Sequence, residues 1–448
     1  MTVDTIFAPS TGAGPAGIAV IRLSGPGAES ALRRLTGTVA PPRRLVRARI
    51  TDGATDDGTG ELIDEGLSVW FPGPDSYTGE DTAELHIHGG RATVAAVLDA
   101  LAACAGLRPA EPGEFTRRAF ENGKMDLTAV EGLADLVAAE TAAQRRQSLR
   151  QLGGDLGRLY ENWREKLLGA LAYQEALIDF SEEELPDEID TKVRLEVAAL
   201  DCRITEHLAD GRRGERLRSG AHVVIVGAPN VGKSSLLNVL ARRDAAIVSE
   251  TAGTTRDVIE VAMDLGGYPV VIADTAGLRN GDSKLEREGV RRARERAGDA
   301  DIKLAVFNAS SWPCVDGETA QLVDADTVVA INKVDLAMPP PPPLNVGGRP
   351  AYPVSAVTGQ GVDALVAVLE REVAERCSVS ASPLLTRVRH RQALEDCRAC
   401  LVRFLAAESP ELAAEDLRLA ARSLGRITGR VGVEDMLDII FHDFCIGK

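Results

Sequence analysis

The chain has 448 residues, a length that accommodates about three domains with separate cores. It is 44% hydrophobic and 26% charged, as ordinary globular proteins are, and it has neither the run of about 20 apolar residues that a membrane span needs nor a secretory signal sequence. The formal net charge of −16 argues against general nucleic-acid binding, which needs cations to neutralise phosphates, and the seven scattered cysteines predict reduced thiols in the cytoplasm.

Residues 1–120 are expected to form a compact α/β domain. Short apolar runs such as GIAVIRLSG and AELHIHGG end at glycine or proline, and helical stretches such as ATVAAVLDALAACAG lie between them. Residues 121–216 carry almost no strand signal and predict a helical domain. Apolar side chains recur there at helical spacing at Tyr160, Trp163, Leu167, Leu171 and Ile178. The acidic stretch SEEELPDEIDTK predicts a loop between two helices.

From residue 217 to 377, strand and helix patterns alternate, beginning with AHVVIVG and continuing with VVIADTAG and TVVAINKVD. This alternation predicts a mostly parallel, doubly wound sheet. Residues 378–448 are helical again, with apolar stripes such as Leu394, Cys397 and Leu401. Two helical tracts on either side of an α/β region indicate one helical domain interrupted by an insertion, so the predicted fold class is multidomain, α/β and α.

The segment GAPNVGKS, from Gly227 to Ser234, matches the phosphate-binding P-loop pattern G-x-x-x-x-G-K-[ST]. It follows an apolar strand and precedes a helix, which is the context that a P-loop requires. Backbone N–H groups and the helix N-terminus would meet the phosphates. Lys233 would neutralise the outer phosphate oxygens, and the Ser234 hydroxyl would bind Mg²⁺.

Two further motifs each close an apolar strand. In DTAG, Asp274 suits the Mg²⁺ side of the site, and the backbone of Gly277 would follow the γ-phosphate. In NKVD, Asp335 would accept both the ring N–H and the exocyclic amine of guanine, which adenine does not offer. Downstream, Ser355 and Ala356 lie where a backbone amide would contact the guanine carbonyl. The order of these motifs predicts a Ras-like P-loop GTPase domain.

The loop sequence IVSETAGTTRD lies between the P-loop and DTAG. A threonine in it, Thr254 or Thr255, would ligate Mg²⁺ only while the γ-phosphate is present, which would make the loop a switch. Leu278 follows DTAG, where many small GTPases have a glutamine that orients the attacking water. A leucine cannot do this, so Glu286 and Glu288 in the next acidic segment are candidates, although such residues are ordinarily a solvated helix face.

Several segments along the chain, most of them flanking the GTPase core, are more distinctive than the P-loop. They are DTIFAPSTG, IRLSGPGA, SYTGEDTAELHIHGG, PGEFTRRAFENGKMDLTAVEGLADL, AGTTRD, DTAGLR and the terminal FCIGK. With them, the whole chain resembles the MnmE (TrmE) family of tRNA-modification GTPases. The resemblance implies a dimerising, tetrahydrofolate-binding domain at 1–120, a helical domain at 121–216 and 378–448, and an inserted G domain at 217–377.

The resemblance also implies the reaction and the partners. With a flavin-dependent partner, MnmG (GidA), the family modifies carbon 5 of the wobble uridine in certain tRNAs, and a 5-formyl or 5,10-methylene tetrahydrofolate donates one carbon. G domains of a homodimer would meet through their switch regions, with K⁺ in place of an arginine finger. K⁺ would be bound by the side chains of Asn230 and Thr254 and by the carbonyls of Ser249 and Thr251.

By the same resemblance, Ser234 and Thr255 would hold Mg²⁺, with Asp274 acting through water. Lys233 and Glu286 would be catalytic, and Glu286 would orient the attacking water. The GTP contacts expected from the motifs and the resemblance together are Gly227, Asn230, Val231, Gly232, Lys233, Ser234, Ser235, Ser249, Thr251, Thr254, Thr255, Asp274, Thr275, Ala276, Gly277, Asn332, Lys333, Asp335, Ser355 and Ala356.

The folate pocket of the family corresponds here to Arg22, Glu84, Lys124 and Lys448. Arginine and lysine suit the carboxylates of a folate, and a glutamate can pair with the donor edge of the pterin. Glu84, His86 and His88 alternate along one strand and share a face, so a metal there is a minor alternative. Whether Lys448 would reach the pocket of its own chain or of a partner chain stays open.

Cys445 has the spacing of a prenylated C-terminal cysteine, but lysine is not a usual last residue of that motif. No base is placed beside Cys445 by any motif, so it is only a candidate thiol. Two other functions share the P-loop-to-NKVD core: a ribosome-assembly switch GTPase, and a folate enzyme with a regulatory GTP site. The first usually carries a basic RNA-binding module, and the sequence shows none.

Overall fold

The computed structural model describes residues 4–12, 14–53, 60–179, 187–243, 260–274, 298, 300–337, 345–378, 383–432, 437, 440, 441, 444 and 447. Contacts divide the chain into two compact units, one of residues 1–134 with 425–448 and one of residues 135–424. Among the helices of the described ranges, none is long and apolar enough to cross a membrane.

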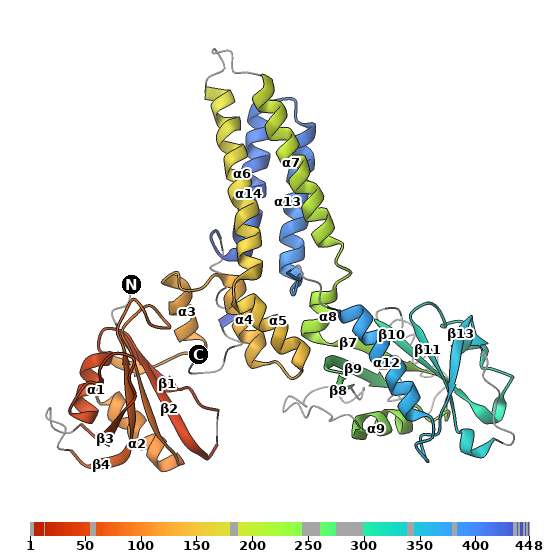
Figure 1. Cartoon of the computed structure of the whole chain (residues 1–448), viewed down its shortest axis with the longest axis horizontal. Helices are drawn as coiled ribbons and strands as arrows, with labels where there is room; N and C mark the ends of the chain where they lie inside the picture. The colour runs from red at the N-terminus through yellow and green to blue at the C-terminus, as the bar shows by residue number, and fades with distance from the viewer. Residues whose placement is uncertain are drawn as a thin grey trace, which may run out of the picture. The chain divides into compact units, whose positions relative to one another are not determined.

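The first unit is built on a mixed six-stranded sheet, coloured red to orange in Figure 1. The strand order is β3-β4-β5-β2-β1-β6, and every neighbouring pair is antiparallel except β1 and β6. The strands are β1 (Thr5–Pro9), β2 (Ala16–Ser24), β3 (Val46–Thr51), β4 (Leu62–Phe71), β5 (Thr82–Gly89) and β6 (Leu107–Pro109). Alternate side chains of β5 are buried, as expected for a sheet with one covered face.

Helices cover that face and complete the core of the first unit. Leu32 and Leu101 from two of the helices pack with Ile21 and Leu85 of the sheet. A second cluster joins Leu127 to Phe441 and Phe444, so the end of the chain returns to the unit that holds its beginning. The helices are α1 (Ala28–Thr36), α2 (Arg91–Ala102), α3 (Glu114–Glu121) and α4 (Leu127–Val137).

The second unit contains a seven-stranded sheet of order β12-β13-β11-β10-β7-β9-β8. The five inner strands are parallel, and the edge strands β8 and β12 are antiparallel to their neighbours. Continuous apolar runs such as AHVVIV are buried on both faces, as parallel strands must be. The strands are β7 (Ala221–Val226), β8 (Glu260–Leu265), β9 (Tyr268–Asp274), β10 (Ile302–Asn308), β11 (Thr327–Asn332), β12 (Asn345–Val346) and β13 (Arg349–Pro353).

Helices flank this sheet in the doubly wound manner that the sequence predicts. α9 follows the P-loop, and α12 packs its buried face of Leu365, Leu369 and Val373 into the core of the sheet. The helical elements are α8 (Arg213–Ser219), α9 (Lys233–Arg243), η2 (Ala309–Ser311), α11 (Gly317–Ala320), η3 (Val334–Leu336) and α12 (Val362–Cys377).

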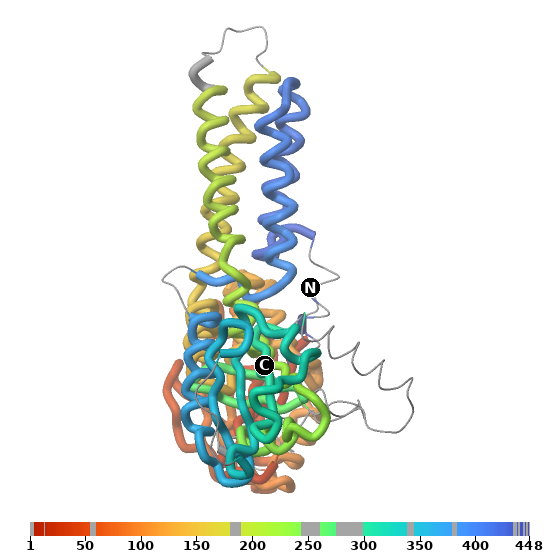
Figure 2. The backbone as a smooth tube through the Cα atoms, turned by 90° about the vertical axis from the view of Figure 1, so that its right-hand side faces the viewer, coloured from red at the N-terminus to blue at the C-terminus, as the bar shows by residue number. Residues whose placement is uncertain are grey.

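The rest of the second unit is a helical body. Figures 1 and 2 show its long helices running side by side, and they come from both sides of the inserted α/β region. They are α6 (Asp155–Asp179), α7 (Asp187–Leu208), α13 (Val388–Ala406) and α14 (Pro410–Thr428), with the shorter α5 (Ala142–Leu152) preceding them. The predicted fold class is therefore confirmed.

One element starts earlier than the sequence predicts. SEEELPDEIDTK is expected to be a loop, but α7 begins at Asp187, so the second half of this stretch is helical. Acidic residues favour a helix N-terminus because the helix dipole is positive there, and Pro186 directly precedes the first turn. In the described part of the stretch, residues 187–192, the acidic composition therefore marks a helix start.

Candidate functional site

The P-loop follows β7 directly and is shaped by two glycines that have no room for a side chain. A Cβ on Gly227 would lie 2.5 Å from the carbonyl oxygen of Val306, and a Cβ on Gly232 would lie 2.3 Å from Nδ2 of Asn332. Gly232 also has φ of +99°, a region that L-residues avoid. Asn230 adopts the left-handed conformation with φ of 63°. The loop therefore curls tightly before α9 begins at Lys233.

Lys233 lies almost wholly inside this loop, with 8% of its surface exposed. Its Nζ donates to the carbonyl oxygens of Gly227 at 2.8 Å and Ala228 at 3.0 Å. The ammonium group is thus held at the N-terminus of an 11-residue helix, where backbone N–H groups and the helix dipole favour an anion. This arrangement suits the terminal phosphates of a nucleotide.

A hydroxyl and a carboxylate meet next to the lysine. Ser234 Oγ donates to Oδ2 of Asp274 at 2.5 Å, and Asp274 is 3% exposed at the end of β9. Oxygen ligands of these two kinds are the ones that Mg²⁺ takes beside phosphates. The residues present therefore fit a magnesium ion. Ser235, the next residue of the helix, is exposed.

Asn332 connects the P-loop to the segment that is expected to bind the base. The side chain is 2% exposed, its Nδ2 donates to the carbonyl of Val231 at 2.8 Å, and its Oδ1 accepts from the backbone N–H of Ala356 at 3.0 Å. Lys333, also left-handed with φ of 65°, donates from Nζ to the carbonyl of Asn230 at 2.6 Å. NKVD is therefore joined to the P-loop by side chains, and not only placed on the same edge of the sheet.

Asp335 lies in the short helix η3, and its side chain is exposed. Ser355, in contrast, is fully buried, and its Oγ accepts from the backbone N–H groups of Val357 at 3.3 Å and Thr358 at 3.1 Å. Ser355 thus shapes the loop after β13. The structure brings the described P-loop residues, Asp274, NKVD and Ser355–Ala356 together at the carboxyl ends of β7, β9, β11 and β13.

Several expected residues lie outside the described ranges, and nothing is said of their placement. They are Ser249, Thr251, Thr254, Thr255, Thr275, Ala276, Gly277, Glu286, Cys445 and Lys448.

In the first unit, Arg22 and Glu84 face each other across β2 and β5. Arg22 donates from Nε to Glu84 Oε1 at 3.0 Å, and the guanidinium lies 5.2 Å from the ring centre of Tyr77 and 6.0 Å from that of Phe115. The second carboxylate oxygen of Glu84 is 3.2 Å from Nε2 of His86. Burial raises the pKa of Tyr77, so this phenol stays neutral over the physiological range.

Lys124 and the end of the chain lie in the same unit. Lys124 is exposed and donates from Nζ to the carbonyl of Pro74 at 2.7 Å, in the loop that also carries Tyr77. Ser10 Oγ donates to the carbonyl of Gly447 at 2.9 Å, which places the penultimate residue beside the end of β1. β1 pairs directly with the strand of Arg22.

Sequence reasoning missed two features of these sites. Tyr77 and Phe115 contact Arg22, although no spacing predicts that a loop and a helix would meet one arginine of β2. The double role of Asn332 was also missed, because a tetrapeptide motif does not show which groups its first residue hydrogen-bonds.

A metal at the histidines is not supported. His88 Nδ1 lies 2.8 Å from Asp64 Oδ1, and the described residues include no metal-binding group of three or more His, Cys, Asp or Glu side chains.

Comparisons with known proteins agree along the whole chain. A family model described as "MnmE helical domain" matches residues 127–445, and one described as "GTP-binding protein TrmE N-terminus" matches residues 5–124. The chain is 57% identical to the tRNA modification GTPase MnmE of Paramagnetospirillum magneticum, over 99% of this chain and 100% of that one. It is 49% identical to the human mitochondrial 5-taurinomethyluridine-[tRNA] synthase subunit GTPB3, over 99% of this chain and 93% of that one.

Proposed function

Because the chain belongs to the MnmE (TrmE) family of tRNA modification GTPases, we propose that its GTP hydrolysis serves the modification of carbon 5 of the wobble uridine in tRNA. The observation that carries the GTP part is the Asn332 bridge, in which the first residue of the guanine-type motif NKVD contacts both Val231 of the phosphate-binding loop and Ala356. The tRNA part is supported by full-length similarity to proteins named for it.

The deciding experiment is nucleoside mass spectrometry of tRNA from cells that lack this protein. We expect the modified wobble uridine to disappear and the unmodified uridine to accumulate in the affected tRNAs. Unchanged nucleosides would rule out the tRNA function and leave a GTPase that acts elsewhere.

In the proposed nucleotide site, each residue has a separate task. Lys233 and the N-terminus of α9 neutralise the outer phosphates, and Asp335 selects guanine. Ser234 and Thr255 would hold Mg²⁺, with Asp274 acting through water, and the ion would neutralise charge on the phosphates during transfer. The short Ser234–Asp274 contact supports this assignment, since both oxygens already converge.

We further assign a K⁺ site to Asn230, Ser249, Thr251 and Thr254, and the orientation of the attacking water to Glu286. Two observations support catalytic groups other than the usual water-orienting glutamine. Leu278 follows DTAG in the sequence, and Asn230 in the P-loop has a left-handed backbone conformation. GTP turnover should be faster in KCl than in NaCl, and tryptophan or nucleotide fluorescence should report K⁺ binding separately from turnover. Equal rates in the two salts would remove this assignment.

For the folate, we propose a pocket of Arg22, Glu84, Lys124 and Lys448 that takes 5-formyl or 5,10-methylene tetrahydrofolate. The guanidinium of Arg22 lies against an aromatic ring, and the Glu84 carboxylate is oriented by two neighbours, so both groups are fixed before a ligand arrives. Cys445, outside the described residues, remains only a candidate thiol.

The proposed domain boundaries are those predicted from the sequence. Residues 1–120 would bind folate and dimerise, residues 121–216 and 378–448 would form the helical domain, and residues 217–377 would form the G domain. The partner would be a flavin-dependent MnmG (GidA) protein, acting with this chain on tRNA in the cytoplasm. Size measurement of the full-length protein, alone and with that flavoprotein, tests the homodimer and the complex.

A further inference from the structure

The chain enters and leaves the G-domain insertion at one place in the second unit, which we call the joint. The entering connection is α8, whose last residues run into β7, and the leaving connection is the segment 383–387 before α13. The two connections cross closely, because a Cβ on Gly214 of α8 would lie 2.2 Å from the carbonyl oxygen of Leu385. The joint is defined by Asp135, Gln144, Gln151, Arg218, Thr386 and Arg387.

One carboxylate holds both connections. Oδ1 of Asp135 accepts from Nε of Arg218 at 3.0 Å and from a terminal guanidinium nitrogen of Arg387 at 2.8 Å. Arg218 is in the last turn of α8, and Arg387 is the residue directly before α13. The Asp135 side chain is 15% exposed, so these pairs are less screened by solvent than ordinary surface ion pairs.

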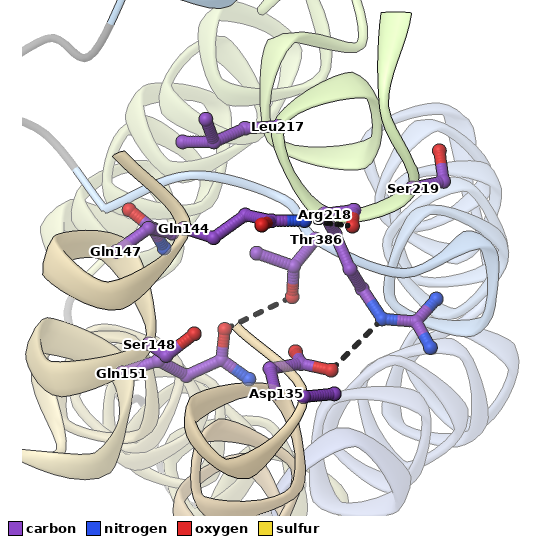
Figure 3. A pocket seen from close by; sticks show the side chains of 10 residues that line it. Asp135, Gln144, Gln147, Ser148, Gln151, Leu217, Arg218, Ser219 and Thr386 are labelled. Carbon is purple, nitrogen blue, oxygen red and sulfur yellow. Dashed lines mark hydrogen bonds and ion pairs between the residues drawn. The ribbon is translucent and has the colours of Figure 1, made fainter. Parts of the chain in front are cut away.

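Neutral hydrogen bonds support the same arrangement, as Figure 3 shows. Gln144 Nε2 donates to the carbonyl of Arg218 at 3.0 Å, and Thr386 Oγ1 donates to Gln151 Oε1 at 3.0 Å. Between these groups lies a cavity of about 180 Å³, lined by polar residues together with Leu217 and Ala138. It is lined in part by Gln147, whose buried Oε1 has no hydrogen-bond partner among the described residues.

This cavity distinguishes the joint from a close-packed core. Its volume accommodates several waters and is smaller than that of a typical small-molecule site. Polar contacts beside such a cavity can exchange with water when the connections shift, whereas an apolar core resists displacement. The joint is therefore held by charge and hydrogen bonds beside a cavity that can hold water.

Two of the strands that end at the nucleotide site, β7 and β9, also start at the joint. β7 begins three residues after Arg218 and ends at the P-loop. β9 begins next to Gly267, whose carbonyl accepts from the backbone N–H of Ala143 in α5 at 3.1 Å, and it ends at Asp274. Each strand spans about 20 Å, so a shift of either strand at the phosphates would reach its opposite end at the joint.

From these contacts, we propose that Asp135 is a positioning residue that transmits the nucleotide state of the G domain to the helical body. By pairing with both connections at once, it makes them move together, so a displacement of β7 or β9 turns the insertion as a unit. Without the carboxylate, each connection would move independently, and the change at the nucleotide would be lost at the joint.

The test is a distance measurement between two natural cysteines of the full-length protein. Cys202 in α7 and Cys314 in the G domain are exposed, whereas Cys104, Cys377, Cys397 and Cys400 are buried. With Cys445→Ser to prevent labelling of that residue, spin labels on Cys202 and Cys314 report the distance in the GDP state and with GDP and aluminium fluoride. We expect a distinct shift of the distribution between the two states.

In Asp135→Asn, the shift should be lost and the distance distribution should broaden. The population in which both connections are held together at the joint should fall about tenfold. Asp135→Glu should restore the shift, and Arg218→Gln, a milder change at a more exposed partner, should reduce it. The matched control is Asp155→Asn, because Asp155 also pairs with two arginines, Arg150 and Arg158, but within the helical body.

Basal GTP turnover in Asp135→Asn should stay within about twofold of the wild-type rate, because the side chain pairs with Arg218 and Arg387, and neither arginine is an expected nucleotide contact. A wild-type protein without a nucleotide-dependent shift would overturn the proposal. So would an Asp135→Asn variant that keeps the wild-type shift and width. None of these outcomes depends on whether tRNA is the substrate.

Discussion

The P-loop and the Arg22 cluster both place a charged group against a sheet, but they are assembled differently. The P-loop is one continuous segment, and its glycines, lysine and serine keep their relations within eight residues. The Arg22 cluster gathers Tyr77, Glu84 and Phe115 from separate elements of the first unit. A site formed by one continuous segment can be recognised in the sequence. A site assembled from separate elements depends on how the strands pair.

The variant expected to distinguish the two regions most strongly is Lys233→Ala. Loss of the ammonium group that is held in the P-loop should lower GTP turnover about 10²–10³-fold, because phosphate charge in transfer is then uncompensated. Folate binding by the same variant, measured by fluorescence titration, should not change. A variant that loses both activities equally would show that the regions are not independent.

Asp335→Asn should change which base is bound. An asparagine keeps the size of the side chain but replaces a charged acceptor, so GTP affinity should fall about 10–100-fold and xanthosine triphosphate should become the better ligand. Titration with fluorescent GTP and xanthosine analogues measures this. Retained preference for GTP would mean that the exposed Asp335 does not contact the base.

Glu84→Gln tests the gathered site. The neutral amide should weaken tetrahydrofolate binding about tenfold while leaving GTP turnover unchanged, because the paired acceptor of the pterin edge loses its charge. Glu65→Gln, on a neighbouring strand and paired with the surface residues Arg47 and Arg49, is the control. Equal folate affinity in Glu84→Gln and wild type would contradict the pocket.

The smallest expected effect is on the pH dependence of stability, and it concerns His207, which belongs to neither site. Burial lowers the pKa of His207 to about 4, and its ring meets the hydroxyl of Tyr160 at 3.1 Å. Since the unfolded histidine has a pKa near 6.5, the unfolded chain binds more protons between these values, and stability should fall by about 1–2 kcal/mol from pH 7 to pH 5.

His207→Gln should flatten this slope in thermal unfolding, and His222→Gln, at an exposed position, should not. A slope that is unchanged in His207→Gln would assign the pH dependence to other groups.

Features that depend on residues close in sequence can be predicted from the sequence, and features that join distant segments cannot. The fold class, the P-loop at its strand end and the four long helices follow from periodicity and motifs, because each depends on residues close in sequence. The start of α7 at Asp187 was misjudged, since acidic residues occur both in loops and at helix N-termini. The Asn332 bridge, the aromatic cover of Arg22 and the Asp135 pairs join residues far apart in sequence, so periodicity contains no information about them.

The central claim is that GTP hydrolysis in this chain serves tRNA modification. The most direct test is wobble-uridine analysis by mass spectrometry in cells that lack the protein and carry either the wild-type chain or Lys233→Ala. We expect the wild-type chain to restore the modified nucleoside and Lys233→Ala, present at the same level, to leave it absent. Full restoration by Lys233→Ala would contradict the account, because the modification would then not need GTP hydrolysis.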